Sequence, residues 1–460
     1  MTARTLALLV VLAVALAGCG TPGGSSGDNA KKAEQSKKNS AKIDVAKAGN
    51  VTLTVWDQEV RGGQAKQIKR LNQAFQSTYP NVKLKRVAKS FTNLKTTLKL
   101  AVSGSKAPDV VEANQGRPDM GQMVKGGLLK PLDTYADAYG WKDRWSKTLL
   151  DLNRFSADGK TFGSGNLYGV AQFGQSTGLF YNKAKLKQYG VDPSKLPTTF
   201  AAFQTMLATV AAKAKGKDTV LVIGNKDGYE ALHAWGMIQG AYTPAQAVRD
   251  WIFHKSGATF DNPTNTQSLN TLMKWVKAGY FGSDYNAVNE NDASAAFAKG
   301  KGVFYMGGNW QAQVIQAGLK SDAGFMNMPA GASGKVAAIG ATSLPWHVSA
   351  KSKYPDVDAA LINYLVAAPT AAKLMYGQNQ IPAVLNAPAA SGNPYLTSIA
   401  NGWQGLVKAN GLTLFPDWAS DTMLTTMGTN FQKMMAGRQS VADTTKAIQA
   451  DWVKFDKTLK

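Results

Sequence analysis

The stretch Val51-Thr-Leu-Thr-Val-Trp56 decides the fold, because its apolar and polar side chains alternate as in a half-buried β-strand. Residues 64–79 then carry apolar side chains at helical spacing, and residues 82–87 alternate again. A second helical pattern covers residues 91–102, and residues 109–111 form a third short apolar run. The succession strand, helix, strand, helix, strand predicts a mainly parallel sheet in an α/β fold.

Polar residues follow two of these predicted strands. Asp57 and Gln58 come after the first strand, and Asn114 and Gln115 come after the third. In open α/β sheets, ligands bind outside the carboxyl ends of the strands. We therefore expect these four planar polar side chains to line a binding site, with turn capping as the structural alternative.

The amino-terminal segment has the layout of an export signal. A basic residue near the start is followed by an apolar run that is too short to span a bilayer, and the run ends at Leu16-Ala17-Gly18-Cys19. This tetrad resembles the bacterial lipoprotein box, which implies cleavage before Cys19 and its lipidation. The prediction is a signal peptide over residues 1–18 and a lipidated, disordered tether over 19–50, on the extracellular face of the bacterial cytoplasmic membrane. An ordinary signal peptide that happens to contain a cysteine is the alternative.

Composition excludes several other classes of function. Cys19 is the only cysteine, so the exported part has no disulfide, and the three histidines lack metal-ligand spacing. There is no phosphate-binding loop, so we expect no metal and no cofactor. The formal net charge is +22, yet the lysines are scattered and no nucleic-acid-binding motif is present. The basic surface indicates solubility, or contact with anionic wall polymer or lipid, and not nucleic acid.

Further along, several degenerate motifs occur in a recognisable order. Together they resemble the extracellular solute-binding proteins of the carbohydrate class (family 1, the maltose-binding type), which serve ABC importers. The resemblance covers residues 51–455. The matching pieces are Val55-Trp-Asp57, Ala107-Pro-Asp-Val-Val111, Gly127-Leu-Leu-Lys-Pro-Leu132, Tyr168-Gly-Val170, Phe180-Tyr-Asn-Lys183, Phe297-Ala-Lys-Gly-Lys-Gly302, Met306-Gly-Gly-Asn-Trp310, Ser349-Ala-Lys-Ser-Lys-Tyr-Pro355, Gln380-Ile-Pro-Ala383 and Met435-Ala-Gly-Arg-Gln-Ser-Val441.

The resemblance implies a two-lobed, periplasmic-binding-protein-like fold with discontinuous lobes joined by crossover hinges. Lobe one would comprise residues 51–167 plus 352–405, and lobe two residues 172–345 plus 406–460. The lobes would close around a carbohydrate, and the permease subunits of the importer would recognise the closed monomer.

The resemblance also supplies the aromatic part of the site. Trp310 matches a position where the family commonly stacks a tryptophan on the sugar, and Asn309 precedes it. Trp235 and Trp346 are weaker candidates that packing alone could explain, and Gln172 lies at the first crossing. We assign Trp56 and Trp452 to the core. Leu424 and Met423 stand where relatives place a cleft aromatic, with Trp418 half a helix earlier, which puts the far subsite in doubt.

Three other functions remain open from the sequence. The ligand is either a neutral oligosaccharide or an anionic solute such as a sugar acid or glycerol phosphate, although Arg117 is the only loop arginine near the predicted site. A secreted glycosidase would need two carboxylates across a cleft, for which acids near residues 57–59, 112 and 119 are available. A wall-binding structural lipoprotein is the third alternative.

Overall fold

The computed structural model describes residues 43–460 except 333, 386 and 388–391, and its first sheet is built from the alternating segments. β1 (Val51–Asp57) lies between β2 (Val82–Ala88) and β3 (Val110–Glu112), and both pairs are parallel. β12 (Pro345–Val348) and β6 (Val170–Ala171) continue the sheet as antiparallel strands, in the order β2-β1-β3-β12-β6. The predicted strands and their parallel pairing are therefore present.

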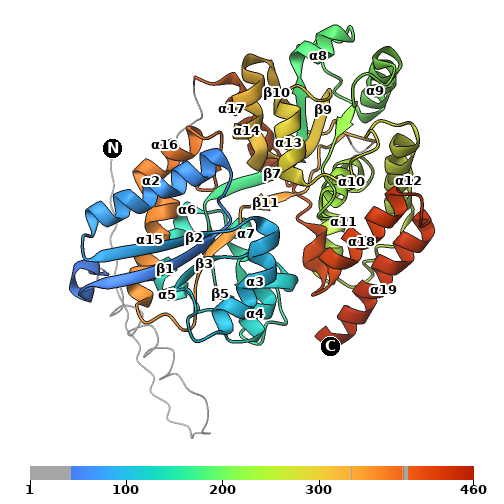
Figure 1. Ribbon diagram of the computed structural model, residues 1–460. Coiled ribbons are helices and arrows are strands. Elements are labelled where there is room, and N and C mark those ends of the chain that lie inside the picture. The colour runs from blue at the N-terminus through green and yellow to red at the C-terminus, as the bar shows by residue number, and fades with distance from the viewer. Residues whose placement is uncertain (1–42, 333, 386, 388–391) are drawn as a thin grey trace, which may run out of the picture. The chain divides into compact units, whose positions relative to one another are not determined.

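Helices cover both faces of this sheet (Figure 1). α2 (Gly62–Thr78) buries Ile68, Leu71 and Phe75 together with the β1 side chains, as its spacing predicts. α3 (Phe91–Ser103) is capped by Ser90, whose hydroxyl accepts a hydrogen bond from the Asn93 N–H. The remaining elements of this part are η1 (Val45–Ala48), η2 (Arg117–Gly121), α4 (Gln122–Lys125), α5 (Asp133–Ala138), α6 (Trp141–Arg144), α7 (Lys147–Asp151), β4 (Arg154–Phe155), β5 (Asn166–Leu167), α15 (Pro355–Ala367) and α16 (Pro369–Tyr376).

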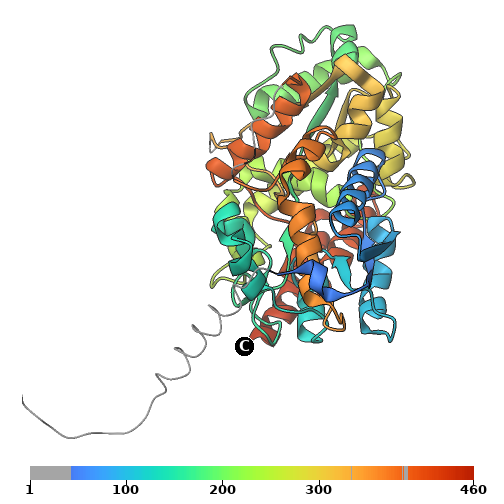
Figure 2. The same ribbon diagram turned by 90° about the vertical axis from the view of Figure 1, so that its left-hand side faces the viewer.

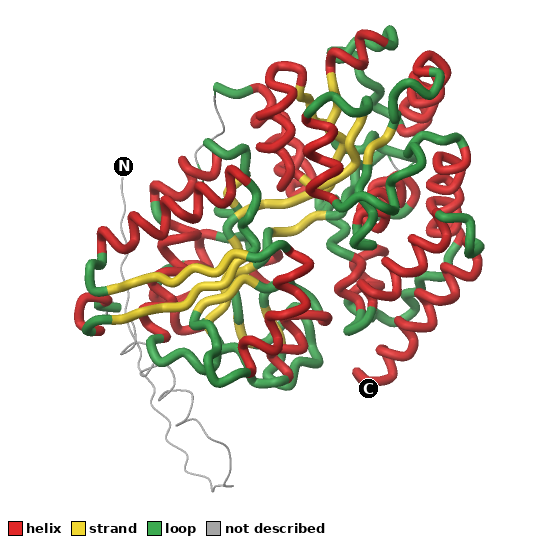
Figure 3. The backbone as a smooth tube through the Cα atoms, viewed as in Figure 1, coloured by secondary structure: helices red, strands yellow, loops and turns green. Residues whose placement is uncertain are grey.

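The second sheet is organised around the ten-residue strand β7 (Phe173–Asn182), which runs between the two groups of strands in Figure 3. Its order is β10-β7-β9-β8, and two further strands pair with the first half of β7. The strands are β8 (Leu221–Val222), β9 (Phe304–Gly308), β10 (Ala323–Met326), β11 (Gly340–Thr342) and β13 (Ile381–Pro382). The helices are α8 (Lys183–Gln188), α9 (Phe200–Ala214), α10 (Glu230–Tyr242), α11 (Ala245–Ile252), α12 (Pro263–Lys277), α13 (Glu290–Ala298), η3 (Asn309–Gln311), α14 (Ala312–Leu319), η4 (Lys320–Asp322), α17 (Pro394–Lys408), η5 (Pro416–Ala419), α18 (Met423–Met435) and α19 (Val441–Leu459).

The chain crosses between the two sheets at three places that lie next to one another. Gln172 alone separates β6 from β7. The Ser343 N–H donates to the Phe173 carbonyl at 2.8 Å, and the Phe173 N–H donates to the Ser343 hydroxyl at 3.2 Å. The Ala383 N–H donates to the Gln172 carbonyl at 2.8 Å. The three crossing segments are thus joined laterally by hydrogen bonds.

These pairings favour lobe limits that differ from those the resemblance suggests, most of all at the second and third crossings. Pro345–Val348 belongs to the first sheet, so the second crossing falls just before it. Ile381–Pro382 pairs with β7, and α17 packs on β10, so residues 381–405 lie with the second sheet. We therefore propose lobe one as residues 51–171 plus 345–376, and lobe two as 173–342 plus 381–460. The signal peptide, Cys19 and most of the tether lie outside the described residues.

Within the described part of the chain, no helix is both long and apolar enough to cross a bilayer. Trp56 is partly buried in the packed interior and Trp452 is buried there, as expected of core side chains.

Candidate functional site

Side chains from both lobes line one cleft, whose empty space is about 620 Å³ when the adjoining open solvent is included. The first part of the chain contributes the loops at the carboxyl ends of β1 and β3 and the start of α3. The second part contributes the start of α10, the start of α13, the turn after β9 and the segment around η5. The lining residues are Gln58, Arg61, Phe91, Asn114, Gln115, Gln175, Tyr229, Leu232, His233, Glu290, Trp310, Thr342, Leu344, Phe415, Asp417 and Leu424.

Three of the polar residues expected at strand ends line this cleft. The Gln58 backbone N–H donates to Glu112 Oε2 at 2.8 Å, which fixes the loop after β1. Gln115 Nε2 donates to the Thr342 hydroxyl and to the Ser343 carbonyl, both at 2.9 Å, and so connects β3 to the second crossing. Asn114 precedes it in the same loop. The parallel sheet therefore brings these side chains to one edge, as its topology dictates.

Trp310 is positioned by the glycines that precede it. β9 ends at Gly307 and Gly308, and a Cβ atom on Gly308 would lie 2.1 Å from the Trp310 ring. The indole therefore lies directly on the strand backbone, with its edge against the His233 ring at a centroid distance of 5.4 Å. Trp310 retains 7% of its surface exposed, and its ring lines the cleft.

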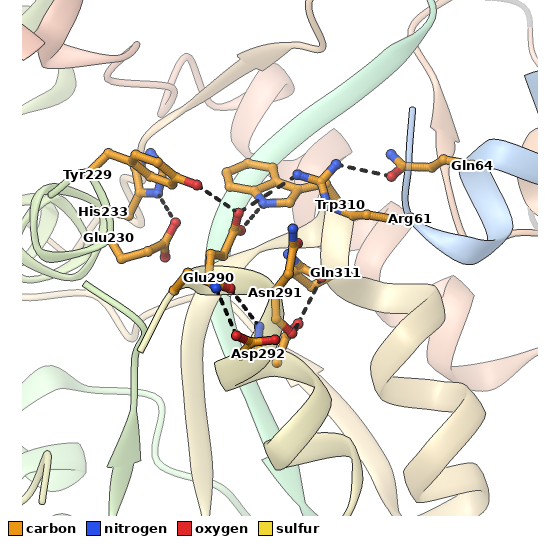
Figure 4. A network of polar contacts seen from close by, with 12 residues as sticks. Arg61, Gln64, Tyr229, Glu230, His233, Glu290, Asn291, Asp292, Trp310 and Gln311 are labelled. Atoms are coloured by element: carbon orange, nitrogen blue, oxygen red, sulfur yellow. Dashed lines mark hydrogen bonds and ion pairs between the residues drawn. The ribbon is translucent and has the colours of Figure 1, made fainter. Parts of the chain in front are cut away.

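Glu290 joins Trp310 to the opposite side of the cleft (Figure 4). One carboxylate oxygen accepts a hydrogen bond from the Trp310 indole N–H. The other accepts from the Tyr229 hydroxyl at 3.4 Å and lies 3.8 Å from Nη2 of Arg61. Arg61 precedes α2 in the first part of the chain, and its Nη1 donates to Gln64 Oε1 at 3.2 Å. A single buried carboxylate thus contacts an aromatic side chain of one lobe and a cation of the other.

The cations of the cleft already have carboxylate partners. His233 Nδ1 lies 3.1 Å from Glu230 Oε1. Burial raises the pKa of Glu230 to about 7, an effect that His233 opposes. Burial lowers the pKa of His233, but Glu230 outweighs it and the net pKa is raised. Asp417 is also buried, which raises its pKa, and it has no ion-pair partner among the described residues. Arg61 and His233, the basic side chains in the described lining, are thus each paired with a glutamate.

A second group of carboxylates lies beneath the first-lobe loops and not in the cleft. Asp57 forms an ion pair with Arg86 at 2.6 Å and is fully buried. Burial raises the pKa of Glu59 to about 7, and burial also raises the pKa of the neighbouring Glu112. These acids support the loop that carries Gln58.

Five residues expected in the site do not line the cleft. Asp57 is held by Arg86, as above, and Trp346 is buried within β12. Gln172 donates to the Leu365 carbonyl at 2.6 Å, and Asn309 donates to the Gly174 carbonyl at 3.1 Å, so both amides serve the backbone. Trp235 is buried in α10, and its indole N–H donates to the Ser268 hydroxyl at 2.8 Å. A tryptophan next to a glycine in sequence does not by itself distinguish a cleft from a core.

The sequence reasoning also missed several lining residues. The sequence places Phe91 only within a predicted helix, but its ring meets the Tyr229 ring edge-on from across the cleft, with the ring centroids 5.6 Å apart. Asn289 caps α13 and Glu290 is the first residue of that helix, so the capping asparagine is the sequence signal that could have indicated Glu290. Leu424 lines the cleft where relatives place an aromatic, while Trp418 is buried and Phe415 contributes a ring nearby.

Among the residues that the structure describes, no three His, Cys, Asp or Glu side chains are grouped so as to hold a metal ion.

Comparison with known proteins agrees with this geometry. The family model described as bacterial extracellular solute-binding protein matches residues 61–372. The multiple sugar-binding protein of Streptococcus mutans is 23% identical over 341 residues, which cover 72% of this chain and 74% of that protein.

Two solved structures share the fold. A chitin oligosaccharide binding protein matches with a TM-score of 0.76 and 18% identity, over 89% of this chain and 99% of its own. A structure from a study of xylan utilisation by Caldanaerobius polysaccharolyticus matches with a TM-score of 0.76 and 25% identity, over 87% and 99%. The expected two-lobed α/β fold is confirmed, and so is the resemblance. The chain belongs to the bacterial extracellular solute-binding proteins.

Proposed function

We propose that this protein is a lipid-anchored extracellular receptor that binds a carbohydrate between its lobes and delivers it to the permease of an ABC importer. The observation that carries the proposal is the cleft lining, in which amide side chains and aromatic rings from both lobes surround one space. Sugars present hydroxyl groups at the ring edge and C–H groups on the ring face, and such a lining suits both.

A neutral oligosaccharide fits this cleft better than an anionic solute. An anion needs a free cation or several convergent N–H donors, because a buried charge without a partner is costly. Arg61 and His233 are each committed to a glutamate, and Asp417 adds a further acid. The sugar-binding relative from Streptococcus mutans and the oligosaccharide-binding structural neighbour support the same choice.

Binding without catalysis is the second part of the proposal. Glu290 and Asp417 are the acidic residues in the described lining. Glu290 already accepts hydrogen bonds from Trp310 and Tyr229 and pairs with Arg61, so it serves as a structural hub and not as a free general acid. The acids near residues 57, 59 and 112 lie beneath the cleft loops.

We propose Gln58, Asn114, Gln115 and Trp310 as ligand contacts, together with Phe91 and Asp417. Lipidation at Cys19 would hold this receptor beside the permease and raise its effective concentration there.

A thermal-shift screen of mono-, di- and oligosaccharides, sugar acids and glycerol phosphates tests the proposal. A ligand that binds only the folded state raises the melting temperature in proportion to ln(1 + [L]/Kd). We expect neutral oligosaccharides to raise it, and the shift to shrink in Trp310→Phe, which keeps an aromatic ring but loses the bond to Glu290. A shift with glycerol phosphates alone, or turnover of an oligosaccharide, would contradict the proposal.

A further inference from the structure

The first lobe carries an unusually long segment without acidic residues. Between Arg61 and Pro108 the chain contains eleven lysines and arginines and no aspartate or glutamate. A solvated protein surface normally mixes both signs of charge, so a one-sign segment of this length is unusual.

Seven of these cations are exposed. We call six of them, all except Lys99, the basic edge: Lys66, Lys69 and Arg70 of α2, Lys83 and Lys85 of β2, and Lys106 after α3. β2 is the edge strand of the first sheet, and α2 and α3 lie on opposite faces of that sheet (Figures 1 and 2). None of the six takes part in an ion pair between described residues.

Four of the other five cations lie near acids, and the fifth, Lys89, lies with its Nζ atom 4.2 Å from the centroid of the Trp56 ring. Arg61 pairs with Glu290 and Arg86 pairs with Asp57. Burial raises the pKa values of Asp417 and Asp421, and the nearby cations Lys95 and Lys99 of α3 oppose these rises. Acids from other parts of the chain therefore reach the cleft side of this segment, and the basic edge is the part that they leave uncompensated.

Protection of an edge strand explains only part of this pattern. Lysines on edge strands prevent pairing with other sheets, which accounts for Lys83 and Lys85. It does not account for Lys66, Lys69 and Arg70, which lie on a helix.

We propose that the basic edge is a docking surface for anionic lipid headgroups. This inference rests on the proposed lipid anchor, because 24 positions separate Cys19 from Ile43 and an extended chain of that length reaches at most about 80 Å. Asn81, at the start of β2, donates to the Val45 and Gly49 carbonyls at 2.9 and 2.8 Å. The first described residues are thereby fixed beside the edge strand, so a membrane-held tether keeps this edge within reach of the headgroups. Clustered cations close to an anionic leaflet are attracted to it within about one Debye length.

The test measures vesicle binding without the anchor. The mature chain, residues 19–460 with Cys19→Ser, is sedimented with vesicles of phosphatidylcholine containing 30% phosphatidylglycerol, and with pure phosphatidylcholine vesicles. We expect binding to the anionic vesicles alone, and weaker binding in 300 mM salt than in 50 mM salt. The test variant carries Lys66→Gln, Lys69→Gln, Arg70→Gln, Lys83→Gln and Lys85→Gln.

A matched control variant removes the same charge from the second lobe. It carries five substitutions of exposed lysines that form no ion pair between described residues: Lys187→Gln, Lys217→Gln, Lys274→Gln, Lys277→Gln and Lys446→Gln. We expect at least about tenfold weaker vesicle partitioning for the test variant and less than about threefold for the control. Equal losses would show that net charge alone matters and would overturn the proposal. Absence of anionic-vesicle binding, or binding to purified anionic wall polymer in its place, would also overturn it.

Two further measurements separate this inference from the proposed function. The sugar-induced thermal shift of the test variant should match that of the parent chain, which also shows that the variant folds. Mass spectrometry of the full-length chain made in a bacterium reports lipidation of Cys19 by itself. If the chain is lipidated and binds a sugar but does not bind anionic vesicles, the docking surface is refuted and the proposed function is not.

Discussion

The ion pair between Arg61 and Glu290 predicts a measurable coupling between the lobes. The two charges are 3.8 Å apart, and their side chains are only 11% and 4% exposed. At an effective dielectric constant of about 20, Coulomb attraction at that distance is about 4 kcal/mol. Removing both charges from water when the lobes close offsets part of this gain. We therefore expect a net coupling of about 2 kcal/mol, which corresponds to about thirtyfold in affinity.

A double-mutant cycle measures this coupling. Arg61→Gln leaves Glu290 buried without its cation, and Glu290→Gln keeps an acceptor for the Trp310 N–H but removes the charge. Each single substitution should weaken sugar binding in calorimetry by about thirtyfold, and the double substitution should cost much less than their product. Small-angle scattering of the unliganded chain should show a larger radius of gyration for each single variant, because the ion pair that favours the closed form is lost.

Lys301→Gln is the matched control. It breaks an ion pair with Asp284 at 2.7 Å, but both side chains are about half exposed and lie in one lobe. Surface pairs of this kind contribute little, so its affinity should change by less than about twofold. A coupling below about 0.5 kcal/mol between Arg61 and Glu290 would refute the claim that this pair favours closure.

Three further predictions follow from the site and the core. Gly308→Ala places a methyl group where the Trp310 ring lies, so calorimetry should show sugar binding reduced at least about tenfold, whereas retained affinity would mean that Trp310 does not contact the ligand. Trp235→Ala should lower the free energy of unfolding in denaturant titrations by about 3–5 kcal/mol while the folded fraction keeps its affinity, because Trp235 is buried away from the cleft; a large loss of affinity at full folding would contradict this. Burial raises the pKa of Asp358 from 3.8 to about 8, so the folded chain holds a proton that the unfolded chain releases, and stability falls as pH rises between these values. Asp358→Asn should remove that slope and raise the unfolding free energy at pH 8 by about 2 kcal/mol or more, and an unchanged pH profile would show that this carboxyl is not the source.

Much of the first lobe follows from local pattern. Alternation in residues 51–56 and 82–87 and the helical spacing between them specify neighbouring parallel strands, and the loops after parallel strands must share one edge of the sheet. Gln58 and Asn114 could therefore be assigned to the cleft from sequence order. Asp57 could not be excluded in the same way, because its partner Arg86 comes from the adjacent strand and is fixed only by pairing register.

The second lobe shows what sequence patterns leave undetermined. Trp235 is followed by Gly236 and Trp310 comes two residues after Gly308, yet the Trp235 ring is enclosed by α10, α12 and α18 and the Trp310 ring faces the cleft. The difference is made by long-range packing. Glu290, Asp417 and Phe415 were not assigned because each depends on how helices and loops far apart in sequence meet. The third crossing that we propose comes earlier than the resemblance suggests for a similar reason, since α17 is apolar on one face and could cover either sheet.

The lateral hydrogen bonds at the three crossings have a mechanical consequence. Gln172 alone joins β6 to β7, and its carbonyl accepts a hydrogen bond from the Ala383 N–H of a neighbouring crossing at 2.8 Å. We expect this lateral bond to resist shear and twist of the joint but to permit bending about a line through Gln172, Ser343 and Ala383. We therefore expect lobe motion to be confined to few degrees of freedom, with most of the configurational entropy of the joint lost when the chain folds. Little is left to lose if the proposed sugar is captured, so more of the contact energy in the cleft can then be expressed as affinity.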